Sequence, residues 1–264
     1  MLKLEEIHKV FNPGTVNEKV ALDGLNLHLE PGDFVTVIGG NGAGKSTMLN
    51  CVSGAYRVDS GRIMIDGVDV TALPEYKRAQ FIGRVFQDPM MGTAATMQIE
   101  ENLALAARRG KSRTLRPGIT KQEREGYIEQ LKILGLGLEN RMTAKVGLLS
   151  GGQRQALTLL MATLQKPKLL LLDEHTAALD PKTAAKVLEA TRKIVEKDNL
   201  TTLMITHTMR DAIAYGNRLI MMYDGHVAVD VRGKEKENLT VEQLLGMFSK
   251  ASGSDEADDK LLLS

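Results

Sequence analysis

Compact apolar runs recur along the chain and are separated by stretches with helical spacing. The runs are rich in Val, Ile and Leu, which is typical of strands covered on both faces of a parallel sheet. They occupy residues 34–38, 81–86, 169–172 and 201–205. Because such strands alternate with helices along the chain, the pattern predicts an α/β fold with a mostly parallel sheet.

A second set of strands shows alternation with a period of two or ends in a turn signal. Leu2 and Leu4 alternate with polar residues, as do Leu25, Leu27 and Leu29, which predicts two half-buried strands. The remaining strands are expected at residues 62–65, 219–223 and 227–231, and the last two flank the turn at Asp224-Gly225. They predict a hairpin that closes the strand-rich part of the chain.

Helices are expected where apolar residues return every three or four positions. The expected segments are residues 98–109, 121–134, 151–165 and 240–248. Ser150 and Asp180-Pro181 mark two helix starts, because Ser caps a helix N-terminus and Pro is favoured in the first turn. Residues from about 90 to 150 therefore form a predicted helical insert between two strand-rich regions.

The domain organisation follows from these elements. We expect a single domain over residues 1–250, with a core of about 1–89 and 153–235 and a helical part of about 90–152. A short C-terminal helix at about 240–249 ends the domain. Residues 251–264 form a polar, acidic tail that we expect to be disordered.

The stretch from Gly39 to Thr47 fits the phosphate-loop pattern of Gly, four residues and Gly-Lys-Ser/Thr. It follows an apolar strand and precedes a segment without Pro or Gly, which is the context that the motif requires. Glycine backbone N–H groups and a helix N-terminus bind phosphate. Lys45 is expected to contact the β- and γ-phosphates, and the Ser46 hydroxyl to ligate Mg²⁺. The predicted contacts of the loop are Gly39, Gly40, Asn41, Gly42, Ala43, Gly44, Lys45, Ser46 and Thr47.

Polar residues follow three further apolar strands. Gln87 and Asp173-Glu174 stand directly after two of these strands, and His207 stands just after the third, next to Thr206. Carboxyl ends of parallel strands share one edge of a sheet, where ligands bind. We expect Asp173 to bind Mg²⁺ and Glu174 to polarise the attacking water. Gln87 is expected to reach both metal and water, and His207 to sense the γ-phosphate.

The stretch Leu149-Ser150-Gly151-Gly152-Gln153 predicts a second helix start with glycine amides and a hydroxyl, and hence a second anion site. One nucleotide does not need two such sites within one chain. We interpret Ser150, Gly151, Gly152 and Gln153 as capping a nucleotide held by another subunit.

Composition limits the remaining possibilities. The net charge of the 264 residues is +1, so charge does not indicate a nucleic-acid binder, and no aromatic residues interleave with the basic segment 108–118. The single cysteine, Cys51, is expected to be a small core residue. No apolar run approaches the roughly 20 residues that span a bilayer. The N-terminus lacks the long apolar segment of a secretory signal, so we expect a cytosolic protein.

With these motifs together, the chain resembles the ATP-binding cassette (ABC) ATPases, the nucleotide-binding subunits of ABC transporters. Similarity covers about residues 1–235. The matching motifs are Walker A at 39–47, the Q-loop Gln87, the signature LSGGQ at 149–153, Walker B at 169–174, the D-loop at 178–180 and the switch histidine His207.

The resemblance implies a phosphate-loop (RecA-like) core, an antiparallel β subdomain and a helical signature subdomain. It implies that Phe11 stacks on adenine and that Asp180 lies among the nucleotide-binding residues. It also implies a head-to-tail dimer with a second copy or a paralogous ATPase, in which two ATP molecules are sandwiched between Walker A and the partner's signature. A membrane permease would dock on the helical insert, with residues 88–93 near its coupling helix.

The family usually has Pro after the catalytic Glu, whereas His175 stands there in this chain. We expect this departure to loosen the local backbone without removing a reactive group. A free-standing ATPase chain resembles importer components, and residues 98–103 are similar to ATPases of amino-acid-type importers. The resemblance therefore favours import of a small solute such as an amino acid, with a solute-binding protein in the assembled transporter and the ATPase on the inner face of the membrane.

Three alternatives remain. ABC-type ATPases of DNA repair place long coiled coils between Walker A and the signature, and this chain has no sustained heptads there. Translation factors of this type carry paired cassettes, whereas this chain has one. LSGGQ argues against a small-molecule kinase or GTPase. The main alternative to a transporter subunit is thus a soluble ABC-type ATPase acting on nucleic acid or ribosomes.

Overall fold

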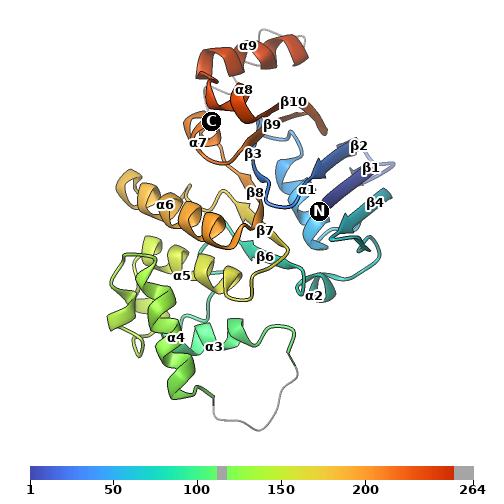
Figure 1. Cartoon of the computed structure of the whole chain (residues 1–264). Coiled ribbons are helices and arrows are strands. Elements are labelled where there is room, and N and C mark those ends of the chain that lie inside the picture. The colour runs from blue at the N-terminus through green and yellow to red at the C-terminus, as the bar shows by residue number, and fades with distance from the viewer. Residues whose placement is uncertain (112–117, 253–264) are drawn as a thin grey trace. The chain divides into compact units, whose positions relative to one another are not determined.

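The computed structural model describes residues 1–111 and 118–252. They form two compact units (Figure 1), one of residues 1–81 together with the segment from 201 onward, and the other of residues 82–200. Each unit contains part of the predicted α/β pattern.

The first unit contains an antiparallel sheet in the order β2-β1-β4-β5. Its strands are β1 (Leu2–Phe11), β2 (Lys19–Leu29), β4 (Ser60–Ile65) and β5 (Val68–Asp69). The leucines predicted to alternate, from Leu2 to Leu29, are all buried. This sheet confirms the expected antiparallel β subdomain.

A second group of strands in the same unit runs in the order β10-β9-β3-β8. The central strand β3 (Phe34–Ile38) lies parallel to β8 (Thr201–Ile205) and β9 (Arg218–Tyr223), and β10 (His226–Arg232) pairs antiparallel with β9. The expected hairpin at 219–231 is therefore confirmed. Every residue of β3 and β8 is buried, as the apolar runs predicted.

Five helices belong to the described part of the first unit: α1 (Lys45–Ser53), α2 (Glu75–Arg78), α7 (Met209–Ala214), α8 (Gly233–Glu237) and α9 (Val241–Ser252). The helix α9 confirms the predicted C-terminal helix, and its Leu244 and Phe248 pack in a core cluster with Ile38, Leu219 and Met221. The short helices α2, α7 and α8 had no distinct signal in the sequence.

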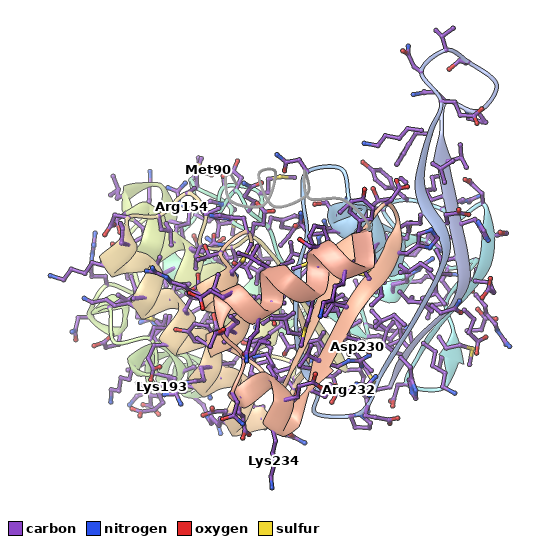
Figure 2. The ribbon with its side chains drawn as sticks, turned by 90° about the horizontal axis from the view of Figure 1, so that it is seen from above. Met90, Arg154, Lys193, Asp230, Arg232 and Lys234 are labelled. Carbon is purple, nitrogen blue, oxygen red and sulfur yellow. The ribbon has the colours of Figure 1, made fainter. Side chains whose placement is uncertain are left out.

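Arg218 joins the two groups of strands within the first unit. Its guanidinium is 3% exposed and forms a two-pronged bond with Asp230, at 2.8 and 2.7 Å. It also donates to the backbone carbonyl of His28 in β2. Arg232 lies beside the same carboxylate, at 3.0 Å (Figure 2). A bidentate guanidinium–carboxylate pair fixes both distance and orientation, so β2 and β10 are connected by a directional polar contact.

The second unit is built on the parallel pair β6 (Ile82–Val85) and β7 (Leu169–Asp173). Leu169 to Leu172 have no exposed surface, which confirms the prediction of a strand covered on both faces. The helices are α3 (Ile99–Ala107), α4 (Lys121–Lys132), α5 (Gly151–Thr163) and α6 (Pro181–Asp198), with 3-10 turns at Leu138–Asn140 and Val146–Leu148.

The predicted helix starts of this unit are found where the capping residues stand. Thr120 and Ser150 each form a capping box with the residue three positions later, and Asp180 caps α6 with Pro181 in the first turn. The predicted helical insert differs at its beginning, because residues 88–98 form turns and bends rather than helix. The Asn102 side chain bonds both backbone groups of Ala94, and these bonds fix the turn conformation. The acidic tail and most of the basic 108–118 loop lie outside the described residues.

Candidate functional site: nucleotide-binding and hydrolysis motifs

The phosphate loop connects β3 to α1, as the sequence predicts. Gly39 has φ +149°, and a Cβ there would lie 2.3 Å from the carbonyl oxygen of Met222 in β9. Gly44 has φ +99°, and its Cβ would lie 2.6 Å from the carbonyl oxygen of Ala21 in β2. Neighbouring strands thus leave no room for side chains, and the positive φ angles favour Gly as well. The loop is built for close backbone approach.

Lys45 begins α1 and is 8% exposed. Its Nζ donates to the carbonyl oxygens of Gly39, at 2.5 Å, and Gly40, at 3.2 Å. The ammonium group therefore points back over the loop, where it can exchange carbonyl oxygens for phosphate oxygens. Ser46, next along, is exposed, so its hydroxyl is accessible to a ligand.

Lys19 is a cation near the loop that the motif does not include. A Cβ on Gly42 would lie 3.1 Å from the Nζ of Lys19, and Lys19 pairs with Phe11 across β1 and β2. Position in the sequence gives no signal for this approach, because it depends on the register of two strands. The positive charge of Lys19 adds to the attraction of the loop for phosphate.

Phe11 ends β1 and lies against Tyr56, with ring centroids 5.4 Å apart and planes at 79°. The Nζ of Lys9 lies 5.5 Å from the Phe11 ring centroid and bonds Asp59 at 2.8 Å. Phe11 is thus part of an aromatic pair, and sequence analysis missed its partner Tyr56. An edge-to-face aromatic pair fixes the orientation of the Phe11 ring.

His207 follows β8 after one intervening residue, Thr206, and its side chain is exposed. It also lies near Asp211 in α7. Burial raises the pKa of the Asp211 carboxyl, and the nearby His207 charge opposes that shift.

Cys51, in the middle of α1, is 1% exposed, and burial raises the pKa of its thiol to about 11. The prediction of a small core residue rather than a reactive thiol is confirmed.

Asp173 ends β7 in the second unit and Glu174 follows it, and both residues are half-buried. Arg84 of β6 lies 3.5 Å from the Asp173 carboxylate and stacks on the Phe86 ring at 4.6 Å. This pairing was not predicted, because it depends on the β6–β7 register. The Asp173 carboxylate is thus paired with a positive charge within the second unit.

Of the predicted magnesium ligands, Ser46 belongs to the first unit, and Gln87 and Asp173 belong to the second. Among the residues that the structure describes, no group of three or more His, Cys, Asp or Glu side chains gathers. The Ser46 hydroxyl, the Gln87 amide and the Asp173 carboxylate each offer an oxygen atom, the kind of ligand that Mg²⁺ prefers. Gln87 is exposed just after β6, whose end is fixed by a 2.9 Å bond from the Gln155 side chain to the Phe86 carbonyl.

His175, which stands where the family usually has Pro, is part of the core of the second unit. It is 2% exposed, and its Nε2 lies 3.1 Å from the Oγ1 of Thr191 in α6. Burial lowers the pKa of His175 to about 4. The residue is therefore a neutral, hydrogen-bonded part of the core, directly after Glu174.

The signature motif forms the start of α5. The Ser150 Oγ accepts from the Gln153 N–H at 3.3 Å, and the Gln153 side chain accepts from the Ser150 N–H at 3.2 Å. Gly151 is exposed and Gly152 is buried. The expected helix start with glycine amides is therefore present, while Asp180 at the D-loop accepts from the Thr183 N–H at 3.1 Å and caps α6.

Arg154 connects the signature helix to the segment 88–93. It is 7% exposed, donates to the Val146 carbonyl at 3.1 Å and contacts the Met90 sulfur (Figure 2). Met90 and Met91 are 53% and 68% exposed. The segment thus presents apolar side chains at the surface while Arg154 ties it to α5.

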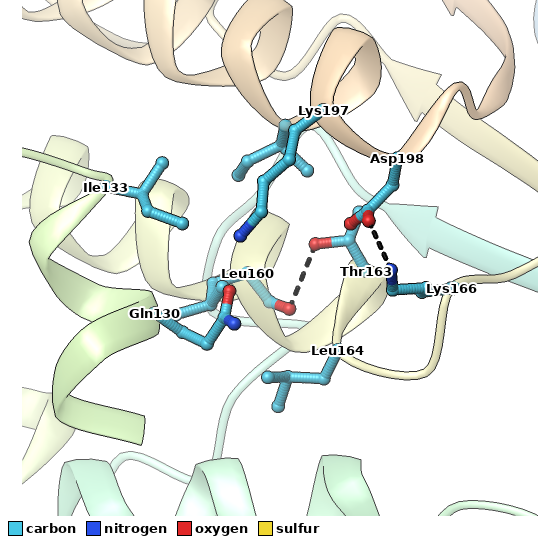
Figure 3. Close-up of a pocket in the computed structure, with 9 residues that line it drawn as sticks. Gln130, Ile133, Leu160, Thr163, Leu164, Lys166, Lys197 and Asp198 are labelled. Atoms are coloured by element: carbon cyan, nitrogen blue, oxygen red, sulfur yellow. Dashed lines mark hydrogen bonds and ion pairs between the residues drawn. The ribbon is translucent and has the colours of Figure 1, made fainter. Parts of the chain in front are cut away.

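One pocket of the second unit lies away from all of these motifs. It has a volume of about 110 Å³, and its walls come from α4, α5 and α6 (Figure 3). Lys166 pairs with Asp198 at 2.5 Å across its rim. Its lining includes no residue that the sequence predicted for nucleotide binding.

A phosphate loop after a buried strand, an acidic pair after a second strand and a capped LSGGQ helix define a class of protein, the phosphate-loop ATPases with an ABC signature. Comparison with known proteins agrees. A family model described as ABC transporter matches residues 22–177.

The relatives include the tyrosine transport ATP-binding protein of Clostridioides difficile, which is 47% identical over 95% of this chain and 100% of its own length. The methionine import ATP-binding protein MetN of Bartonella henselae is 34% identical over 89% of the chain and 66% of its own length. A dimeric ATP-binding cassette, solved in a post-hydrolysis state with ADP and Pi, is 31% identical and covers 88% of this chain and 98% of its own, with a TM-score of 0.75.

The chain belongs to the ABC transporter family of ATP-binding proteins. It is an ATP-binding ATPase subunit of a transporter. Within the described residues, no helix is long and apolar enough to cross a membrane.

Proposed function

We propose that this ATPase subunit drives import of an amino acid, with an aromatic amino acid as the favoured cargo. The observation that carries the proposal is the 47% identity, over 95% of this chain, to a tyrosine transport ATP-binding protein. The similarity to a methionine import protein supports the broader class at lower identity.

The motif residues take the following roles in the proposal. Phe11 stacks on adenine and residues 39–47 bind the phosphates, with Lys45 on the β- and γ-phosphates. Ser46, Gln87 and Asp173 hold Mg²⁺, which neutralises phosphate charge when bound. Glu174 orients and polarises the attacking water, and His207 contacts the γ-phosphate.

The partners follow from the same motifs. The helix start at Ser150–Gln153, together with Asp180, closes over a nucleotide held by a second copy or by a paralogous ATPase. The exposed Met90 and Met91, anchored through Arg154, are suited to contact an integral membrane permease. The subunit therefore works at the inner face of the cell membrane, and a solute-binding protein delivers the cargo.

Because the cargo is chosen by the permease, the test uses the assembled complex. The full chain is captured from native membranes in mild detergent, and co-purifying proteins are identified by mass spectrometry. We expect a multi-span membrane protein and a solute-binding protein. The complex, reconstituted in liposomes, should hydrolyse ATP faster with Tyr, Phe or Trp than with Met or Leu.

If Met stimulates ATP hydrolysis more than the aromatic amino acids do, the cargo is a sulfur-containing amino acid, and only the proposal of an aromatic cargo is rejected. Co-purification of ribosomes, DNA or soluble proteins alone would overturn the transport proposal in favour of a soluble ABC-type ATPase.

A further inference from the structure

His175 occupies a buried position where the family pattern has Pro. Its side chain is 2% exposed, and its partner Thr191, sixteen residues later in α6, has no exposed surface. Burying an imidazole costs free energy unless its polar atoms are bonded. The Nε2–Oγ1 contact of 3.1 Å therefore restricts where the ring can lie.

The second bond of Thr191 fixes the direction of the first. The Thr191 hydroxyl donates to the Val187 carbonyl at 2.9 Å. A hydroxyl has a single proton, so the Nε2 of His175 must donate the other bond to Thr191. Because burial also keeps the ring neutral at physiological pH, the imidazole carries its proton on Nε2. The segment after β7 is thus tied to the middle of α6 by a directed chain from His175 through Thr191 to Val187.

Glu174, the residue just before this anchor, has an uncommon backbone conformation. Its φ is +44°, in the left-handed region, and its carbonyl accepts from the Ala177 N–H at 3.0 Å. Such a conformation costs free energy for a residue other than Gly and persists where the surroundings determine it. Pro at the next position would restrict this backbone covalently and push it toward the extended region. His175 leaves the left-handed region open.

We propose that His175 is a positioning residue, which fixes the backbone of Glu174 through its bond to Thr191 and so sets where the Glu174 carboxylate is presented. The inference rests on the proposed role of Glu174 in polarising water. It acts on the geometry of that carboxylate and leaves nucleotide binding at residues 39–47 unchanged.

The test uses Thr191→Val and His175→Ala in the full chain. Thr191→Val keeps the side-chain shape and removes the hydroxyl that accepts the bond from His175. We expect this variant to preserve the fold better than His175→Ala does. The matched control is Thr163→Val in α5. Thr163 is 4% exposed, and its hydroxyl donates to the Leu159 carbonyl in its own helix at 2.9 Å, as the Thr191 hydroxyl does to the Val187 carbonyl. Steady-state ATP hydrolysis and binding of a fluorescent ATP analogue are measured for each.

We expect Thr191→Val and His175→Ala to lower kcat at least tenfold, with KM and nucleotide affinity within twofold of the unchanged protein. Thr163→Val should keep kcat within twofold. In a Glu174→Gln background, adding Thr191→Val should change the residual turnover less than twofold, because the carboxylate that His175 positions is already gone.

The outcomes separate the inference from the proposed function. If Glu174→Gln suppresses turnover but Thr191→Val behaves like Thr163→Val, His175 only fills the core and the inference is overturned. The inference is also overturned if Thr191→Val lowers turnover by the same factor in the unchanged protein and in the Glu174→Gln background, because the effect would then not act through the Glu174 carboxylate. If Glu174→Gln hydrolyses ATP at the normal rate, Glu174 does not polarise the attacking water, and the positioning role of His175 is rejected as well.

Discussion

The two adjacent glycines of the signature should respond in opposite ways to Ala. A Cβ on Gly152 would lie 1.9 Å from the Cγ2 of Thr183, at the start of α6. A Cβ on Gly151 would lie 3.5 Å from the Leu179 Cδ2, an ordinary contact. Substitution at Gly152 therefore forces α5 and α6 apart locally, whereas substitution at Gly151 does not.

The magnitude follows from that contact. To reach the 3.4 Å of ordinary contact from 1.9 Å, atoms must move by 1.5 Å (3.4 − 1.9). Overpacking of this kind costs about 1–3 kcal/mol. The gain in helix propensity from Gly to Ala offsets at most about 1 kcal/mol. We expect Gly152→Ala to lower the free energy of unfolding by about 1–2 kcal/mol and Gly151→Ala to leave it unchanged or slightly higher.

A second substitution tests the cause. Thr183→Ser removes the Cγ2, and the next nearest atoms, Thr183 Cβ at 3.4 Å and Oγ1 at 3.9 Å, then accept the new methyl group. Urea unfolding, monitored by circular dichroism, gives the free energy of unfolding of each variant, and the variants are compared at the same dependence of that free energy on urea concentration. The double variant Gly152→Ala with Thr183→Ser should be as stable as Gly151→Ala. A steric clash at Gly152 is ruled out if Gly152→Ala unfolds at the same urea concentration as Gly151→Ala, or if adding Thr183→Ser restores none of the lost stability.

Two further predictions concern the first unit. Lys45→Ala should abolish binding of a fluorescent ATP analogue in a fluorescence titration, because it removes the ammonium group that lies over the loop at the Gly39 carbonyl. Retained affinity would count against this role. Arg78→Met should lower the free energy of unfolding by about 2–4 kcal/mol, because the 2%-exposed guanidinium donates to four backbone carbonyls. In the same urea experiment, Arg78→Lys should lose less stability than Arg78→Met. If the two variants lose equally, the positive charge at this position contributes nothing to stability.

The features that the sequence predicts well are local. The phosphate loop, the capping box of Ser150 and Gln153 and the buried leucines of β7 each depend on residues within a few positions of one another. Their signals are spacing and residue type, which the sequence contains in full.

The features that it did not predict depend on contacts between distant segments. His175 looks like a loop residue until α6 brings Thr191 beside it, and Arg84 meets Asp173 only through the β6–β7 register. The turns at 88–98 are another example, since the side chain of Asn102, inside the following helix, fixes Ala94. Such contacts join segments that are far apart in the sequence, so residue type and local spacing give no signal for them.

The most direct test of the account is the oligomeric state of Glu174→Gln with ATP, measured by gel filtration with light scattering. We predict an ATP-dependent dimer that contains two bound nucleotides, because binding persists while turnover is suppressed. Adding Ser150→Arg should abolish that dimer while each monomer still binds ATP, since the signature would no longer close over the partner's nucleotide. A Glu174→Gln chain that stays monomeric with ATP, or a dimer that survives Ser150→Arg, would contradict the account.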